Sequence, residues 1–92
     1  MKNTALITGA SAGIGRELAR IHAQKGGDLI LVARRRDALD TLAAELKAAH
    51  GTQSLVIAAD LSEETAPQVI YDQLRAADVT VDILGSGLIT RI

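Results

Sequence analysis

Residues 8–15 read Thr-Gly-Ala-Ser-Ala-Gly-Ile-Gly, and this stretch decides the fold. An apolar run over residues 4–8 leads into it and predicts a strand. An amphipathic run over residues 13–25 follows it and predicts a helix. A strand, a glycine-rich turn and a helix in this order are typical of a loop that binds the phosphates of a dinucleotide.

The three glycines have separate physical roles in such a loop. Gly9 lets the chain turn out of the strand, Gly13 lets the backbone approach a phosphate, and Gly15 lets the helix pack close to the sheet. The free N–H groups at the start of the helix then face the anion. A tight turn without a ligand is the alternative, and the second strand predicted near residue 30 disfavours it. The predicted phosphate site consists of Gly9, Ser11, Ala12, Gly13, Ile14 and Gly15.

The rest of the chain alternates between strand and helix patterns. Residues 28–33 contain Leu-Ile-Leu-Val at 29–32, an unbroken apolar run typical of a strand buried on both faces. Residues 36–50 predict a helix that ends at Gly51. A third strand is predicted over residues 54–59, a third helix over residues 65–77 with Thr65 as its N-cap, and a fourth strand over residues 81–84. The first two helices are expected to pack through Ile14, Leu18 and Ile21 and through Leu39, Leu42, Ala43 and Leu46.

Right-handed crossovers determine how these elements assemble. They predict an α/β fold over residues 1–92 as one domain: half of a Rossmann fold, with a parallel sheet of about four strands in the order 3-2-1-4 and three helices. The first two helices share one face and the third covers the other. The mean hydropathy of +0.20 is high for so short a chain. We therefore expect an exposed apolar sheet face that drives self-association or receives a missing partner.

The composition excludes several classes of site. Cysteine is absent, so there is no disulfide, no thiolate metal site and no cysteine nucleophile. His22 and His50 have no further ligands at suitable spacing, so no metal site is predicted. The net charge of −1 gives no support to a nucleic-acid partner. No apolar run reaches membrane-spanning length, and a cytoplasmic location is expected.

The glycine spacing Gly-x-x-x-Gly-x-Gly, with Thr8 before it and Ile14 between the last two glycines, resembles the short-chain dehydrogenase/reductase family. The resemblance runs over residues 4–84 and includes Leu-Val-Ala-Arg-Arg at 31–35 and Ala-Asp-Leu at 59–61. It implies a Rossmann fold and an oxidoreductase that uses a nicotinamide dinucleotide.

Three arginines, Arg34 to Arg36, follow the second predicted strand. An acidic residue at this place binds the adenosine ribose of NAD, whereas a cation pairs with the 2′-phosphate of NADP. Ala33 stands where NAD-selective family members carry Asp, so the resemblance implies NADP(H). Arg34 is the favoured phosphate ligand and Arg35 the second. The alternative is a solvated basic run, which is the interpretation for Arg36.

The resemblance also places Asp60 and Leu61 beside the adenine, with the Asp60 carboxylate accepting from the exocyclic amine. A carboxylate that only caps a turn or a helix is the alternative, and the two roles are compatible. Tyr71 and Arg75 imitate the family's catalytic Tyr-x-x-x-Lys. They come too early in the family order, so Tyr71 is interpreted as packing against the sheet and no catalytic residue is assigned.

Residues 85–92, Gly-Ser-Gly-Leu-Ile-Thr-Arg-Ile, depart from the Asn-Asn-Ala-Gly-like segment that the family carries after its fourth strand. The family's catalytic Ser, Tyr and Lys are absent. We therefore expect an NADP(H)-binding half that holds the adenosine diphosphate part of the cofactor and is inactive alone. The alternatives are a self-associating structural module that binds no nucleotide, and an enzyme completed by a second half-domain. The expected partners are the nucleotide and either further copies of the chain or a complementary half-domain.

Overall fold

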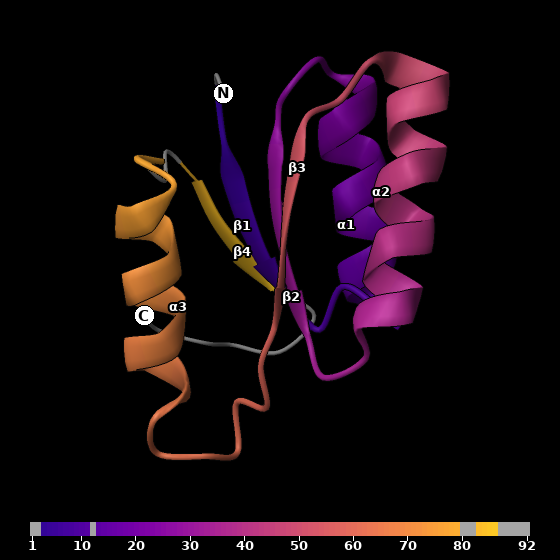
Figure 1. The fold of residues 1–92 in the computed structure, drawn as a ribbon. Coiled ribbons are helices and arrows are strands. Elements are labelled where there is room, and N and C mark those ends of the chain that lie inside the picture. The colour runs from indigo at the N-terminus through magenta and orange to yellow at the C-terminus, as the bar shows by residue number, and fades with distance from the viewer. Residues whose placement is uncertain (1–2, 12, 80–82, 87–92) are drawn as a thin grey trace.

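The computed structural model describes residues 3–11, 13–79 and 83–86, with side chains in the first two ranges. Strands and helices alternate along these residues (Figure 1). In chain order they are β1 (Ala5–Thr8), α1 (Gly13–Gln24), β2 (Leu29–Ala33), α2 (Arg36–His50), β3 (Ser54–Ala58), α3 (Ala66–Ala76) and β4 (Ile83–Ser86).

The four described strands form one parallel sheet in the order β3-β2-β1-β4. Ala5 of β1 is paired with Leu29 on one side and with Ile83 on the other. This arrangement confirms the predicted parallel sheet and its strand order. Strand β4 includes residues 83 and 84 of the predicted span, and residues 81 and 82 of that span lie outside the described part of the chain.

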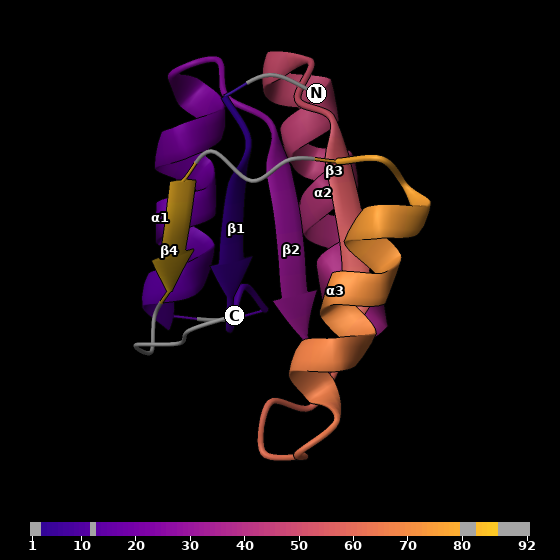
Figure 2. The same cartoon turned by 90° about the vertical axis from the view of Figure 1, so that its left-hand side faces the viewer.

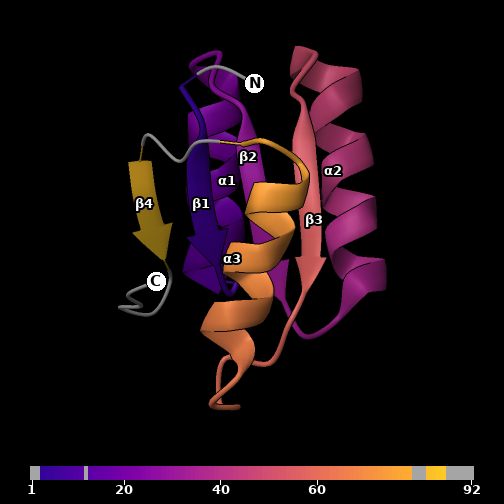
Figure 3. The same cartoon turned by 60° about the vertical axis from the view of Figure 1, so that its left-hand side comes forward.

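The helices form two layers around the sheet. Helices α1 and α2 cover one face and α3 lies across the other (Figures 1 and 3), as the right-handed crossovers predict. On the α1–α2 side, Leu39, Leu42 and Leu46 pack against Ile7 and Leu31. On the α3 side, the buried cluster consists of Leu6, Ile30, Val32, Ile57, Ile70 and Leu74.

The helix ends differ in how well they follow the sequence signals. Helix α2 stops at Gly51, which has φ +70° and donates its N–H to the Lys47 carbonyl oxygen, as a left-handed C-cap does. Thr65 stands at the predicted N-cap of α3, yet its side chain makes no capping hydrogen bond.

Among the described residues, no helix is long and apolar enough to cross a membrane.

The expected exposed apolar sheet face is not found on β1 and β2, whose side chains are buried on both faces. Leu6, Ile30 and Val32 face α3 and are at most 1% exposed. Ile70 and Leu74 of α3 belong to the same buried cluster, and partly buried Leu55, Leu61 and Val79 pack against it. The central strands are therefore buried on both sides.

The exposed apolar side chains are instead on the helices. Ile14 and Ile21 of α1 are 67% and 47% exposed, and Leu18 between them is half-buried. The predicted inward positions Ile14 and Ile21 are therefore wrong, whereas Leu18 packs in part against the core. The buried positions of α1 are Gly15, Ala19 and Ala23, because a helix that lies close to the sheet needs small residues at the contact.

Tyr71 is a second correction on a helix surface. Its side chain is 51% exposed, so it does not pack against the sheet as expected. The Arg75 guanidinium lies 5.7 Å from the centre of the ring, one helical turn further along α3. The pair is a surface cation–π contact.

Candidate cofactor site

The candidate site lies at the edge of the sheet where β1, β2 and β3 end (Figure 2). All strands are parallel, so the segments that follow them gather at this edge. The loop after β1 is also at the point where the strand order reverses, because β2 lies on one side of β1 and β4 on the other. Ligands of open parallel sheets bind at such reversals.

The glycines shape the loop between β1 and α1. Gly13 has φ +60°, and a Cβ added there would meet no protein atom within 4 Å, so this backbone borders open space. A Cβ at Gly15 would collide with the Gly9 carbonyl oxygen and lie 3.0 Å from the Thr8 carbonyl oxygen. The loop therefore leaves space for a ligand at Gly13, and its backbone lies in close contact with α1 at Gly15. Ala12, part of the predicted site, lies outside the described residues.

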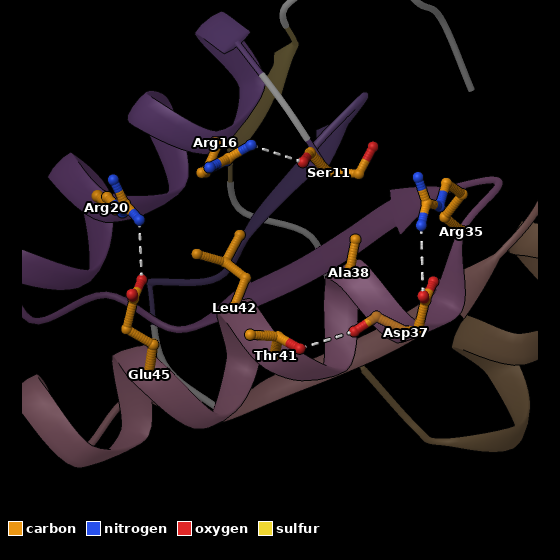
Figure 4. A pocket seen from close by; sticks show the side chains of 9 residues that line it. All are labelled: Ser11, Arg16, Arg20, Arg35, Asp37, Ala38, Thr41, Leu42 and Glu45. Carbon is orange, nitrogen blue, oxygen red and sulfur yellow. Dashed lines mark hydrogen bonds and ion pairs between the residues drawn. The ribbon is translucent and has the colours of Figure 1, made fainter.

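A pocket opens between α1 and the start of α2 (Figure 4). Arg16 donates to the Ser11 backbone carbonyl oxygen at 3.1 Å. Arg35 pairs with Asp37 at 3.4 Å, and Arg20 reaches across to Glu45 at 3.0 Å. The lining residues are Ser11, Arg16, Arg20, Arg35, Asp37, Ala38, Thr41, Leu42 and Glu45.

A second pocket lies on the α3 face of the sheet edge. Arg34 lines it together with Asp60 and residues at the start of α3. Arg34 and Arg35 therefore diverge, as successive side chains at a strand end do. The sequence predicts one phosphate site for both arginines, whereas in the structure they line two different pockets at the end of β2. The pocket is lined by Arg34, Ala58, Ala59, Asp60, Glu63, Thr65, Ala66 and Val69.

Asp60 has the turn-capping role that the sequence analysis kept as its alternative. Its Oδ1 accepts from the Ser62 backbone N–H at 2.9 Å and from the Ser62 hydroxyl at 2.7 Å. These hydrogen bonds, together with the positive charge of Arg34, hold the pKa of Asp60 below its ordinary value. The carboxylate is thus ionised and fixed in direction. Leu61 is half-buried against the α3-side core.

The structure adds pocket residues that the sequence analysis did not single out, among them Arg16, Asp37 and Thr41. Asp37 and Thr41 come to the pocket because α2 begins beside the loop. Arg16 could have been found, because it directly follows the third glycine on the first turn of α1.

Comparison with known proteins places this geometry in a family. The sequence profile of the short chain dehydrogenases matches residues 3–87. This chain belongs to that family. A short chain dehydrogenase of Pseudocercospora fijiensis is 41% identical over 81 residues, which are 88% of this chain and 26% of the relative.

Solved short-chain dehydrogenase structures share the fold. L-sorbose reductase from Gluconobacter frateurii, complexed with NADPH and L-sorbose, superposes with a TM-score of 0.86 at 33% identity, over 96% of this chain and 34% of that one. A short-chain dehydrogenase from Sphingobium yanoikuyae in complex with NADPH gives 0.78 at 42% identity, over 88% and 32%. The chain thus spans about a third of the length of these two proteins.

Proposed function

We propose that this chain is the NADP(H)-binding half of a short-chain oxidoreductase and holds the adenosine diphosphate part of the cofactor. The observation that carries the proposal is the open glycine loop at the start of α1, flanked by Arg34 and Arg35 at the end of β2. The two solved relatives that contain NADPH support the choice of cofactor.

The chain offers groups for each part of the nucleotide. The backbone of Gly9 and Gly13 and the positive end of α1 suit the diphosphate. Arg34 and Arg35 suit the 2′-phosphate, which distinguishes NADP from NAD. Oδ1 of Asp60 accepts hydrogen bonds from Ser62, and its other carboxylate oxygen suits a hydrogen bond from the adenine amine.

Hydride transfer requires more than this site. The cofactor supplies the hydride when it is bound, but a group that exchanges a proton with the substrate and a pocket for the nicotinamide are also needed. The exposed Tyr71 on α3 is paired with Arg75 on the helix surface and does not line either pocket of the site. We therefore propose that the chain binds the cofactor and does not turn over substrate by itself.

Calorimetric titration of the 92-residue chain with NADPH and, in parallel, NADH tests this function. Saturable binding that prefers NADPH is expected, and the Gly13→Ala variant should lose it because a Cβ would stand where the phosphate approaches. Binding of neither nucleotide would overturn the proposal and favour a structural module. Reduction of a carbonyl substrate by the isolated chain would contradict its inactivity alone.

A second role, association with another polypeptide, is favoured by the exposed stripe on α1. Ile14, Leu18 and Ile21 follow one another at helical spacing. Ile14 and Ile21 are 67% and 47% exposed, and Leu18 between them packs in part against the core. We propose that this stripe is covered by a second copy of the chain or by a complementary half-domain. Sedimentation should show species larger than the monomer, and the Ile14→Gln/Ile21→Gln double variant should return them to monomer. A monodisperse monomer in the parent chain would exclude the homo-oligomer.

A further inference from the structure

Three arginines line the pocket between α1 and α2, and they differ in what their charges contact. Arg20 is held by two carboxylates, with Glu17 at 3.2 Å and Glu45 at 3.0 Å. Arg35 is paired with Asp37. Within residues 3–11 and 13–79, Arg16 has no carboxylate partner, and its hydrogen bond goes to the backbone oxygen of Ser11. Its positive charge is therefore the least neutralised of the three.

Arg16 is also well placed to hold an anion. A guanidinium carries five N–H donors, and the hydrogen bond from Nη2 of Arg16 to the Ser11 carbonyl oxygen uses one of them. That hydrogen bond keeps the half-buried side chain beside the phosphate loop, so little side-chain entropy remains to be lost on binding. Figure 4 shows the Arg16 guanidinium directed toward the loop, from the helix opposite Arg35 and Asp37.

We propose that Arg16 is a specificity-determining residue that binds the 2′-phosphate of NADP(H) from the α1 side of the pocket. The proposal rests on the proposed cofactor function and adds a third cation to Arg34 and Arg35. A phosphate monoester carries between one and two negative charges near neutral pH, about −1.5 to −2. Arg16 on α1, together with Arg34 and Arg35 after β2, neutralises more of that charge than Arg34 and Arg35 do without it.

The hydrogen bond from Arg16 to Ser11 gives the residue a second effect. Ser11 belongs to the loop that borders the diphosphate, so a substitution at Arg16 can disturb binding of either nucleotide. Direct contact with the 2′-phosphate predicts a loss specific to NADPH. Support of the loop alone predicts equal losses for NADPH and NADH. The ratio of the two affinities separates these explanations.

The test is calorimetric titration of the parent chain and of Arg16→Gln, Arg16→Lys and Arg36→Gln with NADPH, NADH and adenosine 2′,5′-bisphosphate. Arg36→Gln is the matched control, because it removes the same charge from an exposed arginine that pairs with Asp40 outside the pocket. Circular dichroism of each variant reports on folding. Arg16→Lys keeps the positive charge and a residue that favours the helix. Its nucleotide affinities can therefore be measured even if Arg16→Gln does not fold.

Arg16→Gln is expected to weaken NADPH and the bisphosphate about ten- to hundredfold and NADH much less, as the loss of one charge-assisted hydrogen-bonded contact implies. Arg16→Lys should weaken the binding of NADPH and of the bisphosphate by a smaller factor than Arg16→Gln does. Equal losses for NADPH and NADH, or an Arg16→Gln effect no larger than that of Arg36→Gln, would overturn the role of Arg16 while leaving the cofactor function intact. A parent chain that binds none of the three ligands would overturn both.

Discussion

Arg34 and Arg35 are consecutive residues, yet they line different pockets on opposite faces of the sheet. Strand β2 ends at Ala33, whose side chain is buried on the α1–α2 side. Alternation then directs Arg34 toward α3 and Arg35 toward α1 and α2. A phosphate at the end of β2 can therefore be approached from two sides by neighbouring residues.

The first prediction concerns these two arginines. Arg34→Ala and Arg35→Ala should each weaken NADPH binding about tenfold or more and NADH binding much less, because each removes a charge-assisted hydrogen bond to the 2′-phosphate. The loss should be larger for Arg34→Ala. Titration of both variants with both nucleotides measures this, and equal weakening of NADPH and NADH by Arg34→Ala would contradict its assignment to the phosphate.

The second prediction separates two glycines of the loop. Gly15→Ala should lower the free energy of unfolding by about 1–3 kcal/mol, because its Cβ would collide with backbone atoms of the preceding loop. Gly13→Ala has space for its Cβ, so its cost is mainly the positive φ, about 1–2 kcal/mol. Denaturant unfolding compares the variants. A Gly15→Ala variant as stable as the parent would mean that α1 does not need this close approach.

The third prediction is that Asp37 competes with the cofactor for Arg35. The two side chains are 75% exposed and their ion pair spans 3.4 Å, so the pair is weak and can be exchanged for a phosphate. Asp37→Asn should therefore tighten NADPH binding severalfold while changing NADH little. Asp40→Asn, which removes the partner of Arg36, is the control. Weaker NADPH binding by Asp37→Asn would show that the carboxylate itself supports the nucleotide.

The fourth prediction follows from the pKa of Asp37, which lies below its ordinary value of 3.8. The backbone N–H of Ala38 is the main cause and Arg35 adds to it. A lowered pKa in the folded chain means that the stabilisation from this carboxylate is present above pH 3.8 and is lost as the pH falls through the folded value. Carboxyl NMR titration should show the Asp37 midpoint rising in Arg35→Ala without reaching 3.8. An unchanged midpoint would show that the ion pair does not form in solution.

The fold could be predicted from the sequence because the signals were local and agreed with one another. Unbroken apolar runs indicated buried strands, and Gly51 indicated the end of α2, where its left-handed conformation is observed. The inward face of α1 could not be predicted from hydrophobicity. Close packing on the sheet selected Gly15, Ala19 and Ala23 over the isoleucines, and only the three-dimensional distance between helix and strand reveals that preference.

The candidate site was predictable where the chain itself carries the motif, as in the glycine loop and the arginines after β2. Arg16 and Asp37 belong to different helices, so their meeting at one pocket depends on how α1 and α2 lie side by side. The exposed position of Tyr71 likewise depends on which side of α3 faces the sheet. Such relationships follow from packing between elements and are not visible in the spacing of residues along the chain.

The position of β1 has a consequence for the order of folding. Its partner β2 follows after a single helix, whereas its other partner, β4, is nearly the whole length of the chain away, since Ala5 pairs with both Leu29 and Ile83. Closing the longer loop costs more chain entropy, so β4 should join the sheet last. Amide hydrogen exchange should then be faster in β4 than in β2.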